Sequence, residues 1–199
     1  MKLKVELLTV SVPETFLADV ARVSTGRENF GARDRDADAD VKLLTALYRE
    51  GHWSIFEFLN AIFLVDAPCY VRDQLIRYRC ASYNARSLRR CEPLEIENPE
   101  TESEKFYNDV ALKRYREARG AGLKKEDART CLPSCAPTRW VVNYNARELF
   151  HVFDQRLDER AQVETHAIVR QMLEAFESRC PLLGRLWREE RIEIKRGER

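Results

Sequence analysis

Residues 72–90 of the chain have the sequence RDQLIRYRCASYNARSLRR. Six arginines, one aspartate and no lysine give this stretch a charge of +5, whereas the net charge of the whole chain is +1. Serine, asparagine and tyrosine side chains, which hydrogen-bond and stack, lie between the arginines. A guanidinium group binds phosphate through two parallel hydrogen bonds, which an ammonium group cannot do. The stretch therefore favours a site for a phosphate-rich ligand, and the alternative is an ordinary solvated basic surface.

Length and composition limit the class of protein. The 199 residues, 44% of them hydrophobic, suffice for one domain over residues 1–199 with a substantial core. The 34 basic and 33 acidic residues nearly balance, which argues against a general nucleic-acid-binding protein. We find no signal-peptide pattern and no run of roughly 18 apolar residues. We therefore expect a cytoplasmic protein with small-molecule partners and no contact with nucleic acid or membrane.

The six cysteines and three histidines do not have the spacing of a metal site. No CxxC pair occurs, so we expect no bound metal. Reduced thiols are expected, because the sequence has no secretory signal. The cysteines are Cys69, Cys80, Cys91, Cys131, Cys135 and Cys180.

Hydrophobic periodicity predicts an α+β fold with long helices. Strands are expected at Lys4–Val12, Phe58–Val65 and Trp140–Asn143. Gly26–Asp40 is expected to be a loop that ends in an N-cap Asp, and Cys80–Glu97 an irregular segment. Helices are expected from Pro13 to about Thr25, over Val41–Glu50, from Pro68 onward, and over Glu100–Gly120, Glu126–Leu132, Ala146–Arg156 and Ala161–Cys180.

Four short blocks of sequence carry a family resemblance. They are GHWSIFEF (51–58), RYRCASYNARSLRR (77–90), ARTCLP (128–133) and NARELFHVFDQRLDERAQVE (145–164). In order and spacing they resemble the GHxSxFEH, RHRxxSxNxxSxRY, ARxxLP and NxRxLxxFxxLRxxxxAQxEI blocks of the flavin-dependent thymidylate synthases. The resemblance covers roughly residues 15 to 182.

The resemblance implies a fold, an activity and an assembly. The fold would be a single domain with a small mixed or antiparallel sheet and long helices. The activity would be methylation of C5 of the uracil ring, converting dUMP to dTMP, with FAD as cofactor and NADPH and methylenetetrahydrofolate as cosubstrates. The assembly would be a homotetramer whose active sites are shared between subunits. Two other functions remain open: a UMP C5-methylase of nucleoside-antibiotic biosynthesis, and a non-catalytic nucleotide- or RNA-binding module.

The resemblance also implies residue roles. Arg156 would lie against the uracil ring as the catalytic residue, and His52 would serve the folate. The nucleotide would be contacted by Gln74, Arg77, Ser87, Leu88, Arg89 and Arg129. The flavin would be contacted by Ser54, Arg77, Tyr78, Arg79, Asn145, Arg147 and His151.

The chemistry of uracil agrees with a catalytic arginine. C5 is a poor nucleophile until negative charge builds on the ring, and a fixed guanidinium stabilises that charge as it develops. The other route to C5 methylation adds a cysteine thiolate to the ring, which requires an activated thiol. No cysteine lies in a motif that identifies it as such, although cations near Cys80 and Cys91 leave a minor possibility.

Several positions depart from the family pattern. Tyr78 replaces the histidine of RHR, Ala85 a common glutamate, Arg90 a tyrosine, and Phe58 a histidine. His151 and Arg160 stand where asparagine and histidine are frequent. Because Ala85 removes a carboxylate that would accept ligand hydroxyls, the departures indicate weaker FAD retention and altered nucleotide choice.

Overall fold

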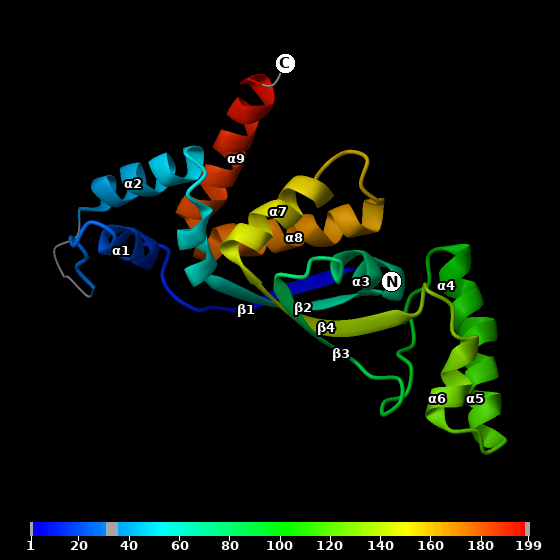
Figure 1. Ribbon diagram of the computed structural model, residues 1–199. Coiled ribbons are helices and arrows are strands. Elements are labelled where there is room, and N and C mark those ends of the chain that lie inside the picture. The colour runs from blue at the N-terminus through cyan, green and yellow to red at the C-terminus, as the bar shows by residue number, and fades with distance from the viewer. Residues whose placement is uncertain (1, 31–35, 198–199) are drawn as a thin grey trace.

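A four-stranded antiparallel sheet lies at the centre of the computed structural model, which describes residues 2–30 and 36–197, with side chains up to residue 190 (Figure 1). The strand order is β1-β2-β4-β3. The strands are β1 (Lys4–Val10), β2 (Asn60–Pro68), β3 (Ala81–Ala85) and β4 (Pro137–Asn145). β4 pairs with β2 along its whole length and with β3 on its other edge, so it is the strand that joins the two halves of the sheet.

Alternating burial gives the sheet one apolar face. Every second side chain of β2 and β4 is buried on that face, among them Phe63, Val65, Trp140, Val142 and Tyr144. Helices α3 (Cys69–Leu75), α7 (Ala146–Arg156) and α8 (Val163–Arg179) contact these strands. Figure 1 shows α7, α8 and α9 (Pro181–Gly197) together on one side of the sheet.

The remaining helices lie at the two ends of the sheet (Figure 1). One end carries α1 (Phe16–Val23), α2 (Ala37–Arg49) and the 3-10 helix η1 (Trp53–Phe58). The other end carries a lobe formed by residues 102–131. The lobe contains α4 (Glu102–Phe106), the π-helical turn η2 (Tyr107–Ala111), α5 (Leu112–Gly120), α6 (Lys125–Ala128) and the 3-10 turn η3 (Arg129–Cys131). Among the described residues no helix has the length and apolarity needed to cross a bilayer.

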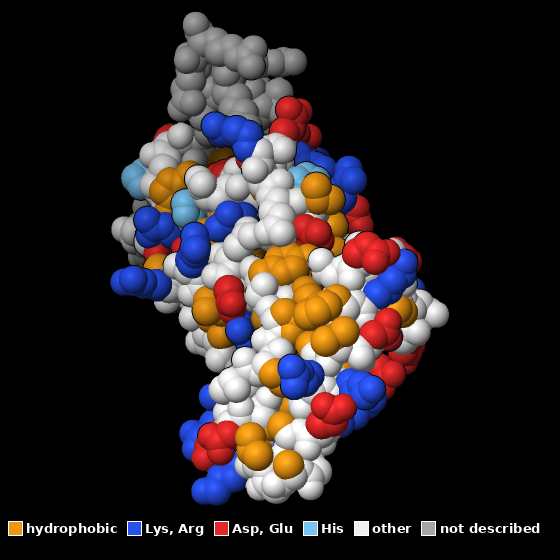
Figure 2. All heavy atoms as spheres, turned by 90° about the vertical axis from the view of Figure 1, so that its right-hand side faces the viewer, with side chains coloured by type: hydrophobic (Ala, Val, Ile, Leu, Met, Phe, Trp, Pro, Cys, Tyr) orange, Lys and Arg blue, Asp and Glu red, His pale blue; other side chains and the backbone are white. Residues whose placement is uncertain are grey.

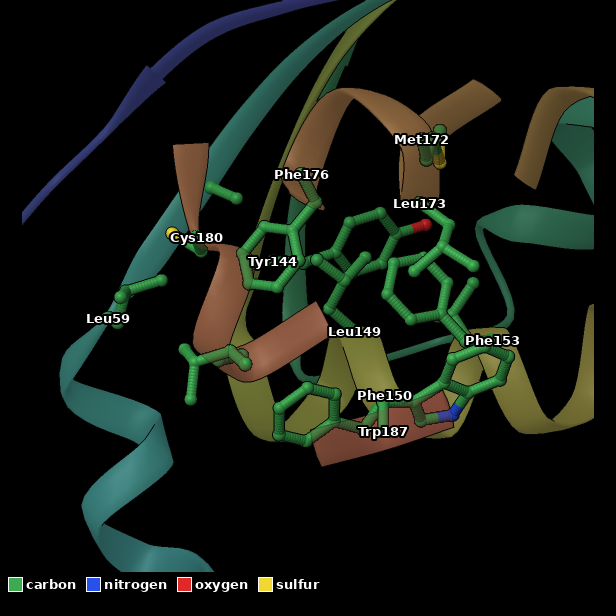
Figure 3. Close-up of a cluster of buried hydrophobic side chains, with 14 of the residues drawn as sticks. Leu59, Tyr144, Leu149, Phe150, Phe153, Met172, Leu173, Phe176, Cys180 and Trp187 are labelled. Carbon is green, nitrogen blue, oxygen red and sulfur yellow. The ribbon is translucent and has the colours of Figure 1, made fainter. Parts of the chain in front are cut away.

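The main core lies between the sheet and helices α7 to α9 (Figure 3). Phe153 of α7 is fully buried in this core, and its ring centroid lies 6.3 Å from that of Phe176 and 5.4 Å from that of Trp187. The indole N–H of Trp187 donates to Asp154 Oδ1 at 3.0 Å, so the one polar atom of that ring is satisfied. These contacts fix α7 against α8 and α9.

A second, smaller apolar cluster holds the lobe. Its buried members are Ile96, Tyr107, Ala111, Leu112 and Ala136. The Asn108 amide accepts from Ile96 N at 3.1 Å and donates to Ile96 O at 2.6 Å, which satisfies both main-chain polar groups of Ile96. The Tyr107 hydroxyl donates to Leu94 O at 2.6 Å. The π-helical turn therefore fastens the segment that follows the arginine-rich stretch.

The face seen in Figure 2, viewed from the side of the lobe, carries no continuous basic surface. Basic and acidic side chains are interspersed around an apolar patch. This pattern agrees with the near balance of charge in the sequence.

The α+β class and the small antiparallel sheet are confirmed, while several boundaries were wrong. Residues 81–85 were expected to be irregular but form β3, because β4 supplies the hydrogen bonds. The alternation of half-buried Ala81 and Tyr83 was hard to recognise, since it is short and lies among polar residues. The strand expected at Trp140–Asn143 extends over nine residues. The strand expected from Phe58 begins at Asn60, after η1.

The helix ends also differ from expectation. α2 begins at Ala37 because Asp36, rather than Asp40, is the N-cap and accepts from Ala39 N at 3.0 Å. The expected loop is therefore shorter, and its residues 31–35 lie outside the described residues. The helix expected over Glu100–Gly120 contains the π-helical turn. α9 was not predicted at all.

Phe176→Ala should lower the free energy of unfolding by about 3–5 kcal/mol, because Phe176 is fully buried and truncation leaves a cavity. The matched control is Phe106→Ala, since Phe106 is 54% exposed and should change stability by about 0.5 kcal/mol or less. Urea unfolding followed by circular dichroism measures both. Equal losses for the two variants would contradict this assignment of the core.

Candidate active site

Arg156 is the last residue of α7, and its guanidinium lies over an aromatic ring. The helix begins at Asn145, whose side-chain oxygen accepts from Glu148 N at 2.8 Å. The Arg156 Cζ atom is 5.5 Å from the centroid of Tyr78, within the range of a cation–π contact. One Nη group donates to Gln74 O at 3.4 Å, and the buried Nε has no partner among the described residues. The guanidinium is thus held between the main-chain oxygen of Gln74 and the side chain of Tyr78.

The Tyr78 ring contacts two side chains of α7, those of Arg156 and His151. It is 7% exposed, and its ring meets His151 edge-on, with centroids 5.6 Å apart and an interplanar angle of 77°. Burial raises the pKa of Tyr78, and the positive charge of Arg156 acts in the opposite direction. The histidine-to-tyrosine departure at this position therefore supplies a large ring that both Arg156 and His151 contact.

A pair of tyrosine hydroxyls fixes the end of α3 beneath this site. The Tyr83 hydroxyl donates to Leu75 O at 2.6 Å and lies 3.0 Å from the Tyr144 hydroxyl. Burial raises the pKa of Tyr83 to about 12. Because Tyr83 belongs to β3 and Tyr144 to β4, the sheet positions the turn that carries Tyr78.

Gln74, expected to contact the nucleotide, is engaged within the chain. Its amide N–H donates to the Gln162 side chain, and its amide oxygen accepts from Thr165 Oγ1 at 3.2 Å. Both partners lie at the start of α8, and Thr165 is fully buried. Gln74 therefore joins α3 to α8 and presents its main-chain oxygen to Arg156.

A polar pocket of about 310 Å³ lies between the end of the arginine-rich stretch and the lobe. Ser87, Arg89, Arg90 and Glu126 line it. Arg89 Nε donates to Glu126 Oε2 at 3.0 Å. The pocket brings together the predicted Ser87 and Arg89, whereas half-buried Leu88 and exposed Arg129 are not part of its lining.

Sequence reasoning missed Arg90 and Glu126 as members of this pocket. Arg90 was noted only as a departure from the family tyrosine. Glu126 lies three residues before Arg129, next to the ARTCLP block, and this proximity was the available signal.

Several arginines near the site have no acidic partner in the part of the chain that the structure describes. They are Arg77, Arg79, Arg90 and Arg129, all of them exposed. In contrast, Arg147 donates to Glu57 Oε1 at 2.6 Å, and Arg72 donates to its neighbour Asp73 at 2.7 Å. Unpaired guanidinium groups are available to an anionic ligand without breaking an existing ion pair.

A third region is an apolar pocket of about 750 Å³ between α1, α2 and η1. The predicted residues His52 and Ser54 line it, together with Phe58. Its other lining residues are Phe16, Val20, Ala21, Val23, Ser24, Phe30, Leu47 and Ile55. The Glu57–Arg147 ion pair joins η1 to α7, so this region is connected to the helix that carries Arg156.

The cysteine route receives no support from the one buried and two half-buried thiols whose pKa values are shifted. Burial raises the pKa of Cys69, Cys135 and Cys180, which disfavours the thiolate in each case. Cys80 is exposed and Cys91 is half-buried, and neither lines the polar pocket.

Residues 6–182 match the Thy1 family, described as thymidylate synthase complementing protein. A flavin-dependent thymidylate synthase from Thermotoga neapolitana is 33% identical over 178 residues, covering 82% of both chains. The chain belongs to the flavin-dependent thymidylate synthase family. A member from Geobacter sulfurreducens is 32% identical over 193 residues, covering 87% of this chain and 81% of the relative.

The fold of this flavin-dependent thymidylate synthase family member is shared with a solved structure. The UMP/dUMP methylase PolB from Streptomyces cacaoi, bound with 5-Br dUMP, superposes with a TM-score of 0.81 at 24% identity. The superposition covers 94% of each chain. The family and the fold class expected from the four sequence blocks are thus confirmed.

Tyr83 should make the stability of the protein depend on alkaline pH. In the unfolded chain a tyrosine loses its proton near pH 10, whereas Tyr83 holds its proton in the folded chain up to about pH 12. The folded state therefore binds more protons between these values, and the free energy of unfolding falls as pH rises from 10 to 12. In Tyr83→Phe this fall should be shallower.

Urea unfolding of both proteins at pH 9, 10 and 11 measures the effect. At pH 9 Tyr83→Phe should be less stable by about 1 kcal/mol, because the bond to Leu75 O is lost. An unchanged pH dependence would exclude the assigned role of the Tyr83 hydroxyl.

Proposed function

We propose that this enzyme methylates C5 of the uracil ring of a nucleoside monophosphate, with dUMP as substrate and dTMP as product. Methylenetetrahydrofolate would supply the one-carbon unit, and NADPH the reducing equivalents, through FAD. The observation that carries the proposal is Arg156, a half-buried guanidinium with no carboxylate partner in the described residues, fixed over the Tyr78 ring.

The placement of Arg156 suits the chemistry at C5. A carbon–carbon bond forms at C5 as negative charge spreads to the ring carbonyl oxygens and N3. A guanidinium that is already oriented stabilises this charge without reorganising, and an ion-paired guanidinium would do so less well. The Nη donors of Arg156 that Gln74 O does not use are the groups proposed to face the ring.

The phosphate of the nucleotide would occupy the polar pocket. Ser87 offers a hydroxyl, and Arg89 and Arg90 offer guanidinium donors. Arg77 and Arg129, which have no acidic partner among the described residues, would add to the positive field, while Leu88 and Gln74 would support the same segment. With its phosphate held there, the nucleotide would be oriented by groups that do not take part in bond formation.

The available donors fit a flavin dinucleotide. The unpaired Arg77 and Arg79 suit its pyrophosphate, and Ser54 lies beside an apolar wall that suits a ring system. The side-chain oxygen of Asn145 caps α7, which leaves its side-chain N–H groups for a ligand. Arg147 would donate hydrogen bonds to the flavin once its exposed ion pair with Glu57 rearranges. When bound, FAD supplies the electron-transfer chemistry.

Two neighbouring residues would have indirect or separate roles. His151 packs against the Tyr78 ring, and the Tyr78 ring lies under the Arg156 guanidinium. We propose that Tyr78 and His151 act on the flavin site through this contact, by positioning Arg156. His52 is exposed at the mouth of the apolar pocket and would serve the folate.

We also propose that the enzyme is a cytoplasmic homotetramer with shared active sites. Within one chain the proposed site residues fall into three regions: the Arg156–Tyr78 contact, the polar pocket, and the apolar pocket that contains His52 and Ser54. In a site shared between subunits, one of these regions from one subunit would lie next to a different region from another subunit.

UMP is the second candidate substrate. Ala85 is exposed at the end of β3 and bears no carboxylate, so the site lacks one means of discriminating ribose from deoxyribose. The solved structure with the same fold is itself described as a UMP/dUMP methylase.

A tritium-release assay with C5-labelled dUMP and UMP tests the proposed function directly. Methylation replaces the hydrogen on C5, so tritium should appear in water when FAD, NADPH and methylenetetrahydrofolate are present. We expect release from dUMP, and the rate with UMP measures the second candidate. Absence of release from both nucleotides would refute the proposal.

Arg156→Lys should lower kcat by about 100-fold or more, since the charge is kept but the planar fork and its donors are lost. The KM for the nucleotide and the thermal midpoint should change little, because the polar pocket is untouched. Steady-state kinetics and thermal melting measure these quantities.

The control is Arg89→Ala, which should raise KM before it lowers kcat. Normal turnover by Arg156→Lys, or unfolding of that variant while Arg89→Ala is silent, would show that the role given to Arg156 is wrong.

A further inference from the structure

Glu126 places a carboxylate in the wall of the polar pocket. It lines the pocket together with Arg89 and Arg90, and it accepts one hydrogen bond from Arg89 Nε at 3.0 Å. Both members of this pair are exposed, Arg89 at 66% and Glu126 at 39% of the side chain. Among the described residues the Nη groups of Arg89 make no hydrogen bond, and Arg90 has no acidic partner. The pocket therefore combines two partly free guanidinium groups with one acidic wall.

The ion pair is not needed to hold the lobe. Exposed pairs contribute little to stability. The lobe is already fastened by its apolar cluster and by the Asn108 bonds to Ile96. Two other ion pairs join the lobe to the segment after Arg90, Lys125 with Glu92 at 3.1 Å and Arg116 with Glu95 at 2.8 Å, and they too include exposed side chains. A structural role for Glu126 would duplicate these contacts.

The charge within the pocket suits a small anion better than a large one. Two guanidinium groups and one carboxylate leave a net charge of +1 in the lining. A monophosphate can use the Nη groups of Arg89 together with Arg90, away from the Nε edge that Glu126 occupies. A second phosphoryl group adds negative charge in a pocket of about 310 Å³, where it is repelled by the Glu126 carboxylate.

We propose that Glu126 determines the charge selectivity of this pocket and makes it bind nucleoside monophosphates in preference to diphosphates. The proposal rests on the proposed function, because it takes the nucleotide phosphate to lie against Ser87 and Arg89. It concerns ligand choice only, and Glu126 takes no part in bond formation at C5.

Calorimetric titration of the purified protein with dUMP and with dUDP tests the proposal. The wild type should bind dUMP more tightly than dUDP by on the order of tenfold, the scale of one like-charge interaction in a partly solvated pocket. Glu126→Gln removes the charge but keeps a hydrogen-bond acceptor for Arg89. In this variant the affinity for dUDP should rise more than the affinity for dUMP, so that the preference for dUMP over dUDP falls below about threefold.

Glu92→Gln is the matched control. Glu92 pairs with Lys125 on the same side of the lobe but does not line the pocket, so its ratio should stay at the wild-type value. Displacement of dUMP by orthophosphate and by pyrophosphate on the wild type gives a test that needs no variant, and orthophosphate should compete at least as well as pyrophosphate.

Each other result overturns the proposal. Equal loss of affinity for both nucleotides in Glu126→Gln would mean that Glu126 only orients Arg89. If the ratio of dUMP to dUDP affinity were unchanged in Glu126→Gln, Glu126 would not set selectivity. The same conclusion would follow if this ratio also changed in Glu92→Gln. If the wild type bound neither nucleotide, the phosphate site would be wrong and the proposed function would fail with it. Tritium release by the wild type distinguishes the cases, because an active enzyme with an unchanged ratio contradicts only the role of Glu126.

Discussion

The pairing of β4 with two strands is the constraint on which the site depends. β4 bonds to β2 from end to end and to β3 on its other edge, and it then passes directly into α7 through the Asn145 cap. This one strand therefore sets the distance between the arginine-rich stretch, which contains β3, and the helix that ends in Arg156. The contact between Tyr78 and Arg156 is a consequence of this arrangement, since the two residues are far apart in sequence.

The site retains positive charge that the fold itself does not use. A protein surface normally pairs or solvates its arginines. Here Arg139 is paired bidentately with Asp66 on the sheet, whereas Arg77, Arg79 and Arg129 have no carboxylate partner in the described residues. Arg156 goes further, because its buried Nε lacks even a neutral partner there. A buried donor without a partner costs stability. The exposed guanidinium groups are solvated and stay available to an anionic ligand.

Much of this arrangement could be predicted from the sequence, but not all of it. Periodicity located α7 and α8 to within a few residues, because their apolar stripes face the core. It missed β3, since hydrogen bonds from β4 rather than local preference make that segment a strand. The four sequence blocks identified the family. Neither approach predicted that Glu126 would face Arg89, because this contact joins segments 37 residues apart and depends on how the lobe is held.

The lobe has a consequence for the timing of ligand exchange. The apolar cluster that holds the lobe contains five buried residues, two of which, Ile96 and Ala136, lie outside the lobe, and it is far smaller than the core beneath α7 and α8. Cooperative units with little buried surface open at a smaller free energy than the whole molecule. The lobe, which carries Glu126 and Arg129, is therefore expected to open at a smaller free energy than the sheet. One wall of the polar pocket, Glu126, belongs to the lobe, and the opposite wall, formed by Ser87, Arg89 and Arg90, follows the end of β3. A ligand held in this pocket would therefore leave at a rate that depends on the opening of the lobe.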